Sequence, residues 1–503
     1  MNVTMLLDMA ADVFGDRIVV GRRRDGLTAE RLRALAAGGA GLVRSRGADS
    51  LIYLAVNGPA FPVALFAAAR AGVPLVPVNY RLGAEQLTAL LARHPRAHVV
   101  ADPAQHAIVE QSGLAAQTPA EWLDAAAGPA ADDVEEFVDP DSAAVIIYTS
   151  GTTSAPKGVV LRHQNLVSYV LGTVEFAGAD ADDAALMSVP PYHIAAVSNA
   201  LTNLFAGRRT MVLEAFTPQG WLELVRDQGV TNAMVVPTML TRLMDADGLD
   251  RSVPSLRSLA YGGASMPARV IERALEEWPH VGFVNAYGLT ETSSTITVLG
   301  PDEHRAALSS DLDHVQARLS SAGRAVPGIE IEIRDEHGGR VGPGVAGQIW
   351  VRGDQVSTEY TGKGSTVDPD GWFYTRDEGR LDEDGYLFVG GRVDDTIIRG
   401  AENIAPAEIE NVLLRHPDVA DAVVVGVPDE EWGQRIEAVV VARPGSAPDL
   451  EELRSGVRGA LRGSKTPERI ECWPELPRTP TGKLVRRDVV AGLEVPSRTP
   501  SNT

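Results

Sequence analysis

The chain has 503 residues, of which 44% are hydrophobic and 22% are charged, a composition typical of a folded protein with a substantial core. Asp and Glu outnumber Lys and Arg by 67 to 46, and the formal charge of -21 argues against a nucleic-acid surface or an anionic membrane as the main partner. The single cysteine, Cys472, excludes an intrachain disulfide and argues against a thiol-ligated metal site.

Hydropathy along the chain indicates no integral membrane segment. The N-terminus has no basic region ahead of its short apolar run, and no later apolar segment approaches the length that spans a bilayer. We therefore expect a cytoplasmic protein. The oligomeric state is left open, with a homodimer as one expectation.

Helical and strand-type patterns alternate over the first hundred residues. Leu- and Ala-rich segments with helical spacing predict helices over residues 28–46, 60–71 and 84–93. Short apolar runs between them predict strands over residues 51–56, 73–78 and 97–101. Strands that alternate with helices in this way are typical of a doubly wound parallel sheet.

An apolar run over residues 143–147 predicts a buried strand that leads into the stretch Tyr148-Thr-Ser-Gly-Thr-Thr-Ser-Ala-Pro-Lys-Gly158. Glycine, several hydroxyls and one lysine are groups that can hold a phosphate. The order Lys157-Gly158 followed by two valines differs from the Walker pattern, so an ordinary P-loop ATPase is disfavoured. A surface linker is the alternative interpretation, but the preceding strand and the lysine favour phosphate binding.

The alternation then resumes and later changes in character. A second series predicts strands over residues 186–189, 210–213 and 233–236 and helices over 195–205, 221–228 and 238–244. Short strand candidates without long helices follow over 329–333, 347–351 and 386–389, and a mixed pattern returns with helices over 406–414 and 450–461 and strands over 422–425 and 438–441. We therefore expect an α/β fold. A large N-terminal domain, residues 1–391, would hold two doubly wound lobes and a small β-barrel at about 300–390, and a small mobile α+β domain would span 392–503.

Further short motifs follow the phosphate-type loop in order. They are Tyr261-Gly-Gly-Ala-Ser265, Tyr287-Gly-Leu-Thr-Glu291, Gly371-Trp-Phe-Tyr-Thr-Arg-Asp377, Gly391-Arg-Val-Asp-Asp-Thr-Ile-Ile-Arg-Gly-Ala-Glu-Asn-Ile404 and Pro477-Arg-Thr-Pro-Thr-Gly-Lys483. Each alone is compatible with an ordinary turn, a helix N-terminus or a surface lysine. The strand predicted before Tyr287 would place its ring and the Glu291 carboxylate at a sheet edge, where open α/β sheets bind ligands.

Together the motifs from Tyr148 to Lys483 resemble those of the adenylate-forming superfamily, which includes acyl-CoA synthetases, peptide-synthetase adenylation domains and beetle luciferases. The resemblance implies ATP, Mg²⁺ and coenzyme A as cofactor and co-substrates. It also implies a first half-reaction in which a carboxylate displaces pyrophosphate from ATP, and a C-terminal domain that rotates before the second.

The same resemblance assigns roles to individual residues. Lys483, Thr290 and Glu291 would be catalytic, Glu291 would also help to hold the metal, and Asp394 would be the hinge. Tyr287 would stack on adenine and Asp377 would accept hydrogen bonds from the ribose hydroxyls. The full set of expected ATP-binding residues is Thr149, Ser150, Gly151, Thr152, Thr153, Lys157, Gly262, Gly263, Ala264, Asn285, Ala286, Tyr287, Asp377 and Arg392.

Two positions depart from the family pattern. Arg376 stands where members usually have the glycine of Thr-Gly-Asp, so either the backbone there does not need glycine or an additional positive charge reaches the ligand. Ala401 stands where a second glycine is common near the pantetheine channel, which weakens the thioester half of the prediction.

The acyl pocket would be lined by His193, Ile194, Val197 and Val235, by resemblance. Malonate-activating relatives carry an arginine before the Tyr-Gly motif, where this chain has Ala286, and no acid lies between Tyr192 and Asn199 to pair with an amine. An uncharged acyl tail is therefore favoured.

The expected activity is ATP-dependent conversion of an apolar carboxylic acid to an acyl-adenylate and then to a thioester of coenzyme A. A ligase that loads a separate carrier protein is the nearest alternative. A luciferase-like oxygenase and a non-catalytic acyl or nucleotide binder are the alternatives from other classes.

Overall fold

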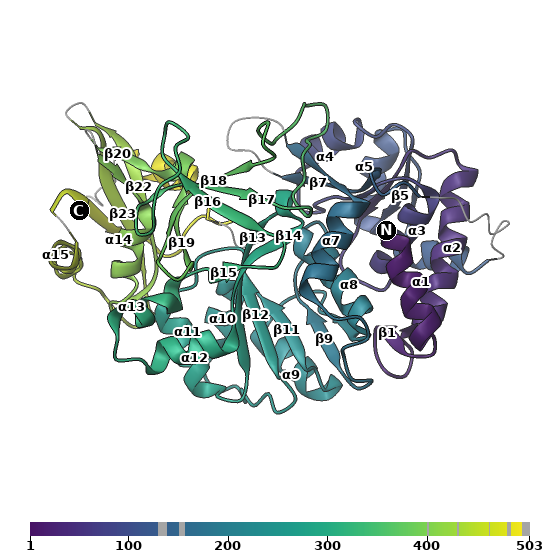
Figure 1. Ribbon diagram of the computed structural model, residues 1–503, viewed down its shortest axis with the longest axis horizontal. Coiled ribbons are helices and arrows are strands. Elements are labelled where there is room, and N and C mark those ends of the chain that lie inside the picture. Colours follow the sequence, from purple (N-terminus) through teal and green to yellow (C-terminus); the bar gives the residue numbers. More distant parts are fainter. Residues whose placement is uncertain are drawn as a thin grey trace, which may run out of the picture.

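The computed structural model describes residues 1–128, 138–149, 156–399, 402–429, 432–461, 463–479 and 484–494. Two α/β lobes, a small antiparallel sheet and a C-terminal α+β domain make up the chain (Figure 1). The two expected α/β sheets are confirmed, whereas the small β-barrel expected at about 300–390 is wrong, because its strands form an open four-stranded sheet with two edges. None of the described helices is long and apolar enough to cross a membrane.

The first lobe is built on a six-stranded sheet in the order β6-β5-β3-β4-β7-β8, parallel except between β7 and β8. Its strands are β3 (Ser50–Leu54), β4 (Leu75–Pro77), β5 (Ala97–Ala101), β6 (Ala116–Gln117), β7 (Ala143–Thr149) and β8 (Lys157–Arg162). Its helices are α2 (Ala29–Ser45), α3 (Ala60–Ala71), α4 (Ala84–Leu91), α5 (His106–Gln111) and α6 (Pro119–Ala126). Since α3 contacts both β3 and α2, almost all its side chains are buried, which explains its apolar sequence.

The second lobe is a nine-stranded sheet in the order β15-β14-β13-β12-β11-β9-β10-β1-β2. Its strands are β1 (Ile18–Val20), β2 (Leu27–Thr28), β9 (Ala184–Met187), β10 (Arg209–Val212), β11 (Asn232–Val235), β12 (Ser258–Gly262), β13 (Gly282–Leu289), β14 (Ser294–Leu299) and β15 (Arg324–Ala325). The helices around it are α7 (His163–Thr173), α8 (Ile194–Ala206), α9 (Pro218–Gln228), α10 (Pro237–Asp245), α11 (Ala268–Glu277), α12 (Pro301–Ser309) and α13 (Asp313–Gln316). Side chains of α9, α10 and α11 form one core with Val235, Leu259 and Phe283 of the sheet, whereas α8 contacts β9, β10 and β14.

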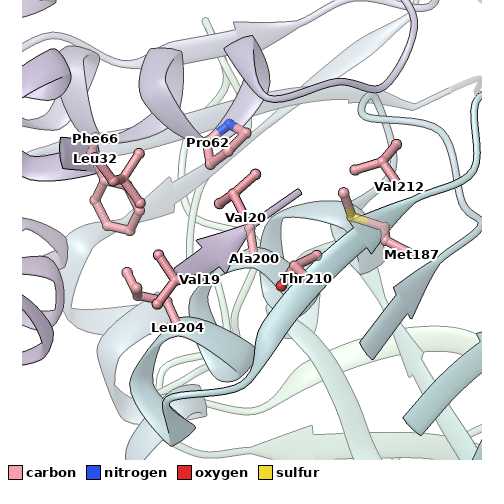
Figure 2. A pocket seen from close by; sticks show the side chains of 10 residues that line it. All are labelled: Val19, Val20, Leu32, Pro62, Phe66, Met187, Ala200, Leu204, Thr210 and Val212. Atoms are coloured by element: carbon pink, nitrogen blue, oxygen red, sulfur yellow. The ribbon is translucent and has the colours of Figure 1, made fainter. Parts of the chain in front are cut away.

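The N-terminal segment belongs to the second lobe, although the sequence pattern suggested two lobes that follow each other along the chain. Helix α1 (Val3–Phe14) contacts α2, α3, α7 and α8, and β1 pairs in parallel with β10 through Val20 and Thr210. A small apolar cavity lies beside this strand, between α2, α3 and α8 (Figure 2). None of the predicted site residues lines it.

The predicted antiparallel unit is an open four-stranded sheet in the order β16-β17-β18-β19, with β16 and β19 at its edges. Its strands are β16 (Glu330–Arg334), β17 (Gly347–Arg352), β18 (Phe373–Leu381) and β19 (Leu387–Arg392). The backbone of Leu387 exchanges hydrogen bonds with Ala322 and Gly323, which joins this sheet to the end of the second lobe.

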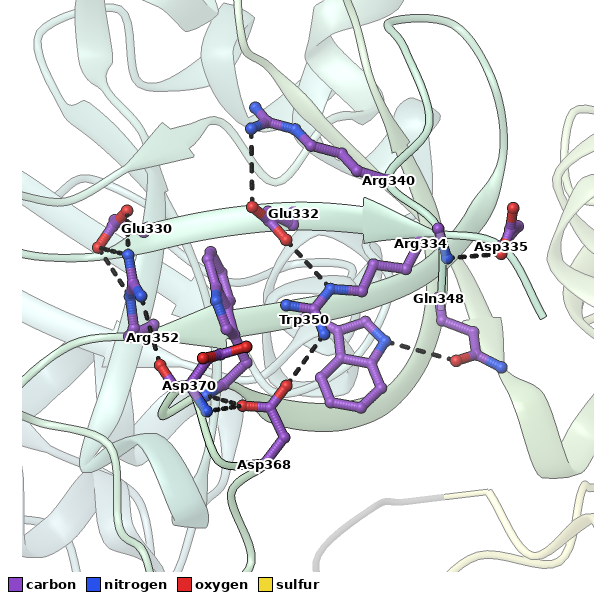
Figure 3. Close-up of polar contacts among 12 residues, drawn as sticks. Glu330, Glu332, Arg334, Asp335, Arg340, Gln348, Trp350, Arg352, Asp368 and Asp370 are labelled. Carbon is purple, nitrogen blue, oxygen red and sulfur yellow. Dashed lines mark hydrogen bonds and ion pairs between the residues drawn. The ribbon is translucent and has the colours of Figure 1, made fainter. Parts of the chain in front are cut away.

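Charged and aromatic side chains stabilise the outer part of this small sheet (Figure 3). Arg334 donates to Glu332 at 3.0 Å and to Asp368 at 3.1 Å, and its guanidinium lies 4.5 Å from the ring centroid of Trp350. Asp368 also accepts from the backbone N–H of Trp372 at 2.8 Å. The network thus holds the turn from which β18 enters the candidate site.

The C-terminal domain follows β19, whose last residue, Arg392, is the predicted first residue of that domain. Its strands are β20 (Ile397–Arg399), β21 (Glu402–Ile404), β22 (Val419–Asp429), β23 (Gly433–Ala442) and β24 (Arg469–Cys472), and its helices are α14 (Pro406–Leu413), α15 (Leu450–Ala460) and α16 (Arg486–Glu494). β22 and β23 pair antiparallel and β24 adds in parallel, so the expected α+β character is confirmed. Arg486 joins α16 to the segment after β19 through Asp395 and to α14 through Glu410.

Candidate nucleotide and acyl site

The two described ends of the phosphate-type stretch lie on paired antiparallel strands. β7 ends at Thr149, β8 begins at Lys157, and these two residues are cross-strand partners. Lys157 therefore opens the returning strand. The predicted phosphate contacts Ser150, Gly151, Thr152 and Thr153 lie outside the described residues.

A segment from the loop before β18 runs alongside β8. Thr361 N–H donates to Gly158 O at 2.8 Å, and Ser357 Oγ donates to Val160 O at 2.6 Å. A Cβ on Gly158 would lie 2.7 Å from Thr361 Oγ1, so glycine is required for this close approach. The packing places Tyr360 beside Lys157, whose Nζ is 5.8 Å from the centroid of the tyrosine ring.

Glu291 is held at the end of β13 by the same segment. It lies with Thr290 on a short 3-10 turn, its backbone O accepts from Ser357 N–H at 2.6 Å, and its carboxylate accepts from the Tyr360 hydroxyl at 2.9 Å. Burial, and then the nearby Glu291 carboxylate, raise the pKa of Tyr360 well above its ordinary value. Tyr360 therefore stays a hydrogen-bond donor to Glu291 throughout the physiological pH range.

The second group of polar side chains joins β13 to β18 and β19. The Tyr287 hydroxyl donates to Asp377 Oδ2 at 2.5 Å, and Arg392 Nε donates to Asp377 Oδ1 at 2.9 Å. Burial, and then the Asp377 carboxylate, raise the pKa of Tyr287 well above its ordinary value. The structure thus brings together the three residues expected to contact adenine, ribose and the rest of the nucleotide.

Asp377 reaches this position because β18 contains a bulge. The register places Thr375, Arg376 and Asp377 opposite the single residue Ile349. Thr375 Oγ1 donates to Ile349 O at 2.8 Å and accepts from Asp377 N–H at 3.1 Å. At the apex of the bulge, Arg376 has a φ of 64°, in the left-handed region that favours glycine. The backbone there thus adopts a conformation that favours glycine, and this chain adopts it with an arginine.

The Gly-Gly motif lies at the ends of β12 and β13. Gly262 is the partner of Ala286, and a Cβ on this glycine would lie 2.2 Å from Ala286 O, so strand pairing alone requires glycine there. Gly263 has a φ of 85°, and Ala264 after it is exposed. Asn285 donates its side-chain amide to Ser321 O at 2.9 Å. The expected adenine-binding residues thus line one sheet edge.

The predicted pocket residues do not all share one surface. His193 caps the start of α8 and is partly exposed, as is Ile194. Val197 and Val235 are each 0% exposed and lie in two different hydrophobic cores, so in this structure they present no surface to a ligand. Neighbouring residues on the opposite faces of α8 and β11 are partly exposed and lie close together, since Asn199 Nδ2 is 3.4 Å from Met234 Sδ.

The two residues predicted on the C-terminal domain and its hinge are not described in full. Asp394 lies on a 3-10 turn after β19, with its side chain outside the described part, and Lys483 lies outside the described residues altogether. The segment after Asp394 contacts the large domain, because Thr396 Oγ1 donates to Glu378 Oε2 at 3.1 Å.

The arrangement suits a magnesium nucleotide. Among the described residues no group of three or more His, Cys, Asp or Glu side chains could enclose a metal. Glu291 is a single partly exposed carboxylate near Lys157, and Mg²⁺ bound to a nucleotide needs only one or two carboxylates because phosphates and waters fill the other positions. Glu291 therefore fits the metal role that its sequence motif suggests.

Sequence reasoning missed Tyr360 and Ser357. Both lie in a loop rich in Gly, Ser and Thr, whose composition indicates only a turn region. Their contacts to Glu291 and to β8 depend on tertiary structure, so no local pattern could have identified them.

Comparison with known proteins agrees with this geometry. The family profile of the AMP-binding enzyme matches residues 7–361, and that of the AMP-binding enzyme C-terminal domain matches residues 408–483. A fatty acid–[acyl-carrier-protein] ligase, ScoC, from Streptomyces coeruleorubidus is 34% identical over 458 residues, covering 88% of this chain and 86% of the relative. A feruloyl-CoA synthase from an Amycolatopsis species is 35% identical over 457 residues, covering 88% of this chain and 89% of the relative.

A solved structure extends the similarity to the fold. The o-succinylbenzoate CoA synthetase (MenE) from Bacillus subtilis, in complex with its acyl-adenylate intermediate OSB-AMP, has a TM-score of 0.84 and 28% sequence identity, covering 96% of this chain and 97% of that one. The same synthetase in complex with ATP and magnesium ion has a TM-score of 0.83 and 27% sequence identity, and the match covers 96% of this chain and 98% of that one. From the matched profiles, the relatives and the grouped site residues, we conclude that this chain belongs to the AMP-binding enzyme family, the adenylate-forming superfamily.

Proposed function

We propose that the protein activates an apolar carboxylic acid with ATP and then transfers the acyl group to coenzyme A. The observation that carries this proposal is the contact of Asp377 with both Tyr287 and Arg392 at the edge of the second lobe. In a family of AMP-binding enzymes, this is a site for the adenosine half of ATP. Relatives named as CoA ligases of feruloyl, indoleacetate and 2-succinylbenzoate substrates support the thioester half.

The polyphosphate would lie between the β7–β8 hairpin and Glu291. Lys157 supplies positive charge at the start of β8, and Tyr360 holds the Glu291 carboxylate in place. Bound there, Mg²⁺ would neutralise charge on the phosphates as pyrophosphate leaves. Lys483, from the C-terminal domain, would stabilise the negative charge that develops while the substrate carboxylate attacks the α-phosphate.

The acid would enter between α8 and the sheet. Ala195 and Asn199 on α8, Met234 on β11 and Ala286 on β13 are partly exposed. These side chains are uncharged, which favours an acid without a second charge, and the small alanines leave room for a ring or a branched tail. We expect the reaction in the cytoplasm, where ATP and coenzyme A are abundant.

A carrier-protein ligase is the second candidate. The similarity to the acyl-carrier-protein ligase from Streptomyces coeruleorubidus raises it, but the other relatives cited above are CoA ligases, so coenzyme A is the favoured acceptor. The adenylation half-reaction would be the same, and only the accepting thiol would differ.

Pyrophosphate release with MgATP and a panel of carboxylic acids tests the proposal. Aliphatic, aryl and dicarboxylic acids should be compared, each with coenzyme A, with a phosphopantetheinylated carrier protein and without a thiol. We expect turnover that needs coenzyme A for an aryl or aliphatic monocarboxylic acid. Thioester formed only on the carrier protein would favour the second candidate, and no pyrophosphate release with any acid would contradict both.

A further inference from the structure

The turn after α4 places two side chains against the paired strands β7 and β8. Arg93 Nη1 donates to Pro156 O at 2.9 Å, and Pro156 directly precedes Lys157. His94 Nε2 and the hydroxyl of Tyr148 form a hydrogen bond of 2.9 Å, and the two rings meet edge to face. The guanidinium of Arg93 also lies 5.5 Å from the centroid of the Tyr148 ring. The turn thus contacts the last part of β7 and the residue before β8.

The last part of β7 extends beyond its pairing with the rest of the first sheet. Within the described strands, β7 pairs with β4 at Val145 alone, opposite Leu75. The residues of β7 after Val145, up to Thr149, pair with β8 instead. β8 in turn is contacted by the segment with Tyr360. The side chains from the turn after α4 therefore add support where the sheet no longer supplies it.

The turn itself is fixed to a packed helix. The N–H of Arg93 donates to Leu90 O at 3.1 Å. The N–H of His94 donates to Leu91 O at 2.9 Å, so both residues continue the hydrogen bonding of α4. Leu90 and Leu91 are buried in a core that includes Ile146 of β7. A shift of the last part of β7 relative to this turn would therefore break the contacts of Arg93 and His94.

We propose that Arg93 and His94 are positioning residues for adenylation, which hold Lys157, the first residue of β8, where the polyphosphate of ATP would bind. The inference rests on the proposed function. In that reaction a carboxylate oxygen forms a bond to the α-phosphorus, the bond from the α-phosphorus to its bridging oxygen breaks, and pyrophosphate takes the electron pair. Catalysis of such a step depends on the placement of charge, so an ammonium group that is held in advance lowers the barrier.

Tyr148→Phe tests the contact on β7, because it removes the hydroxyl, keeps the ring and leaves the buried His94 without this partner. We expect kcat/KM for MgATP to fall about tenfold, and the inhibition constant for pyrophosphate to rise by a similar factor, with the KM for the acid unchanged. His94→Leu should cause the same loss, and His94→Gln, which keeps a polar group, should restore most of it. The double variant of Tyr148→Phe and His94→Leu should lose no more than either single variant, because both remove one bond.

Arg93→Ala tests the contact beside β8 and should also lower kcat/KM for MgATP about tenfold, a loss typical of one hydrogen bond from a charged group. Arg44→Ala is its matched control, since Arg44 Nη1 donates to Arg70 O at 2.9 Å elsewhere in the first lobe. Tyr53→Phe is the control for the tyrosine, because the Tyr53 hydroxyl donates to Val56 O at 3.0 Å. The controls should lower the midpoint of thermal unfolding to a similar extent and leave the KM for ATP unchanged.

Two outcomes separate this inference from the proposed function. If the wild type is active and Tyr148→Phe and Arg93→Ala change only the unfolding temperature, the contacts serve stability alone, and the inference is wrong while the proposed function stands. If the wild type releases no pyrophosphate with any acid, isothermal titration with α,β-methylene-ATP still tests the inference. Weaker binding by the two variants and not by their controls would support it, whereas equal affinities, or no binding by the wild type, would overturn it.

Discussion

The hydroxyl of Tyr360 donates a hydrogen bond of 2.9 Å to the carboxylate of Glu291. The two residues are far apart in the sequence, and the contact exists because the segment with Tyr360 runs along β8 while Glu291 follows β13. It therefore joins β8 of the first lobe to the turn that follows β13 in the second.

Tyr360→Phe tests this link. The change removes the hydroxyl and keeps the ring beside Lys157. Because Glu291 loses the donor that orients it, we expect kcat/KM for MgATP to fall about tenfold, a loss typical of one hydrogen bond to a charged group. Titration of Mg²⁺ at fixed ATP should show a higher requirement. An unchanged magnesium dependence would mean that Tyr360 does not position Glu291.

Gly158→Ala should disturb the contact between Tyr360 and Glu291 from the side of β8. The added methyl group would lie 2.7 Å from Thr361 Oγ1 and 2.9 Å from its Cγ2, so the segment with Tyr360 has to move. We expect a loss of stability of about 1–3 kcal/mol together with reduced activity. Gly342→Ala is the control, because nothing lies within 4 Å of the position of its Cβ. Both are measured by urea unfolding and pyrophosphate release.

Asp377→Asn should weaken ATP binding while the fold persists. The amide keeps the shape of a side chain that is 6% exposed, but it lacks the charge that faces Arg392 and that would accept from the ribose hydroxyls. We expect the KM for ATP to rise about tenfold to a hundredfold. Asp384→Asn removes a carboxylate that is 63% exposed and pairs with Arg318, and it should leave the KM unchanged.

Lys483→Ala should separate the two half-reactions. If Lys483 stabilises charge only during attack on the α-phosphate, pyrophosphate release should fall by about a hundredfold or more, as when an electrostatic donor is removed from an active site. Thioester formation from a supplied acyl-adenylate and coenzyme A should continue at a rate near that of the wild type. An equal loss in both assays would argue against a role limited to adenylation.

His163 should make the free energy of unfolding depend on pH. Burial lowers its pKa to about 4 although Asp139 opposes the shift, and its Nδ1 accepts from Val3 N–H at 3.3 Å. Since the unfolded chain has a pKa near 6.5 at this residue, it binds more protons than the folded chain between these values. The stability contribution is complete above pH 6.5 and is lost as pH falls toward 4.

The comparison variant is His163→Asn, which can still accept from Val3 N–H but does not titrate. Urea unfolding at several pH values should show a shallower decline for the variant, by up to about 1.4 kcal/mol per pH unit. Parallel curves for the two proteins would show that His163 is already protonated in the folded state.

Local sequence pattern accounted for most of the two lobes. The α3 helix was predicted with its exact bounds, because its apolar run ends at Gly72, which has a φ of 74°. β18 was missed because its residues carry a functional motif in place of a regular alternation, and its bulge breaks the period of two. The pairing of β1 with β10 joins distant segments, so no local pattern could have revealed it.

The candidate site was predicted in part. The resemblance supplied Tyr287, Asp377 and Arg392, and the structure brings these three together. Val235 was expected in the pocket by resemblance, but alternation along β11 directs it into the core and leaves Met234 on the other face. A shift of one residue along β11 therefore decides whether a side chain faces the core or the opposite face of the sheet.

The position of the N-terminal segment also affects how the protein is made. Residues of α1 and β1 are synthesised well before β10, yet β1 pairs with β10 and the apolar side chains of α1, such as Leu6 and Leu7, are buried in a core shared with α8. These surfaces stay uncovered until a much later part of the chain has been synthesised. The N-terminal segment therefore cannot complete its folding until the second lobe is synthesised, and nascent chains halted before β10 should be the ones that chaperones retain.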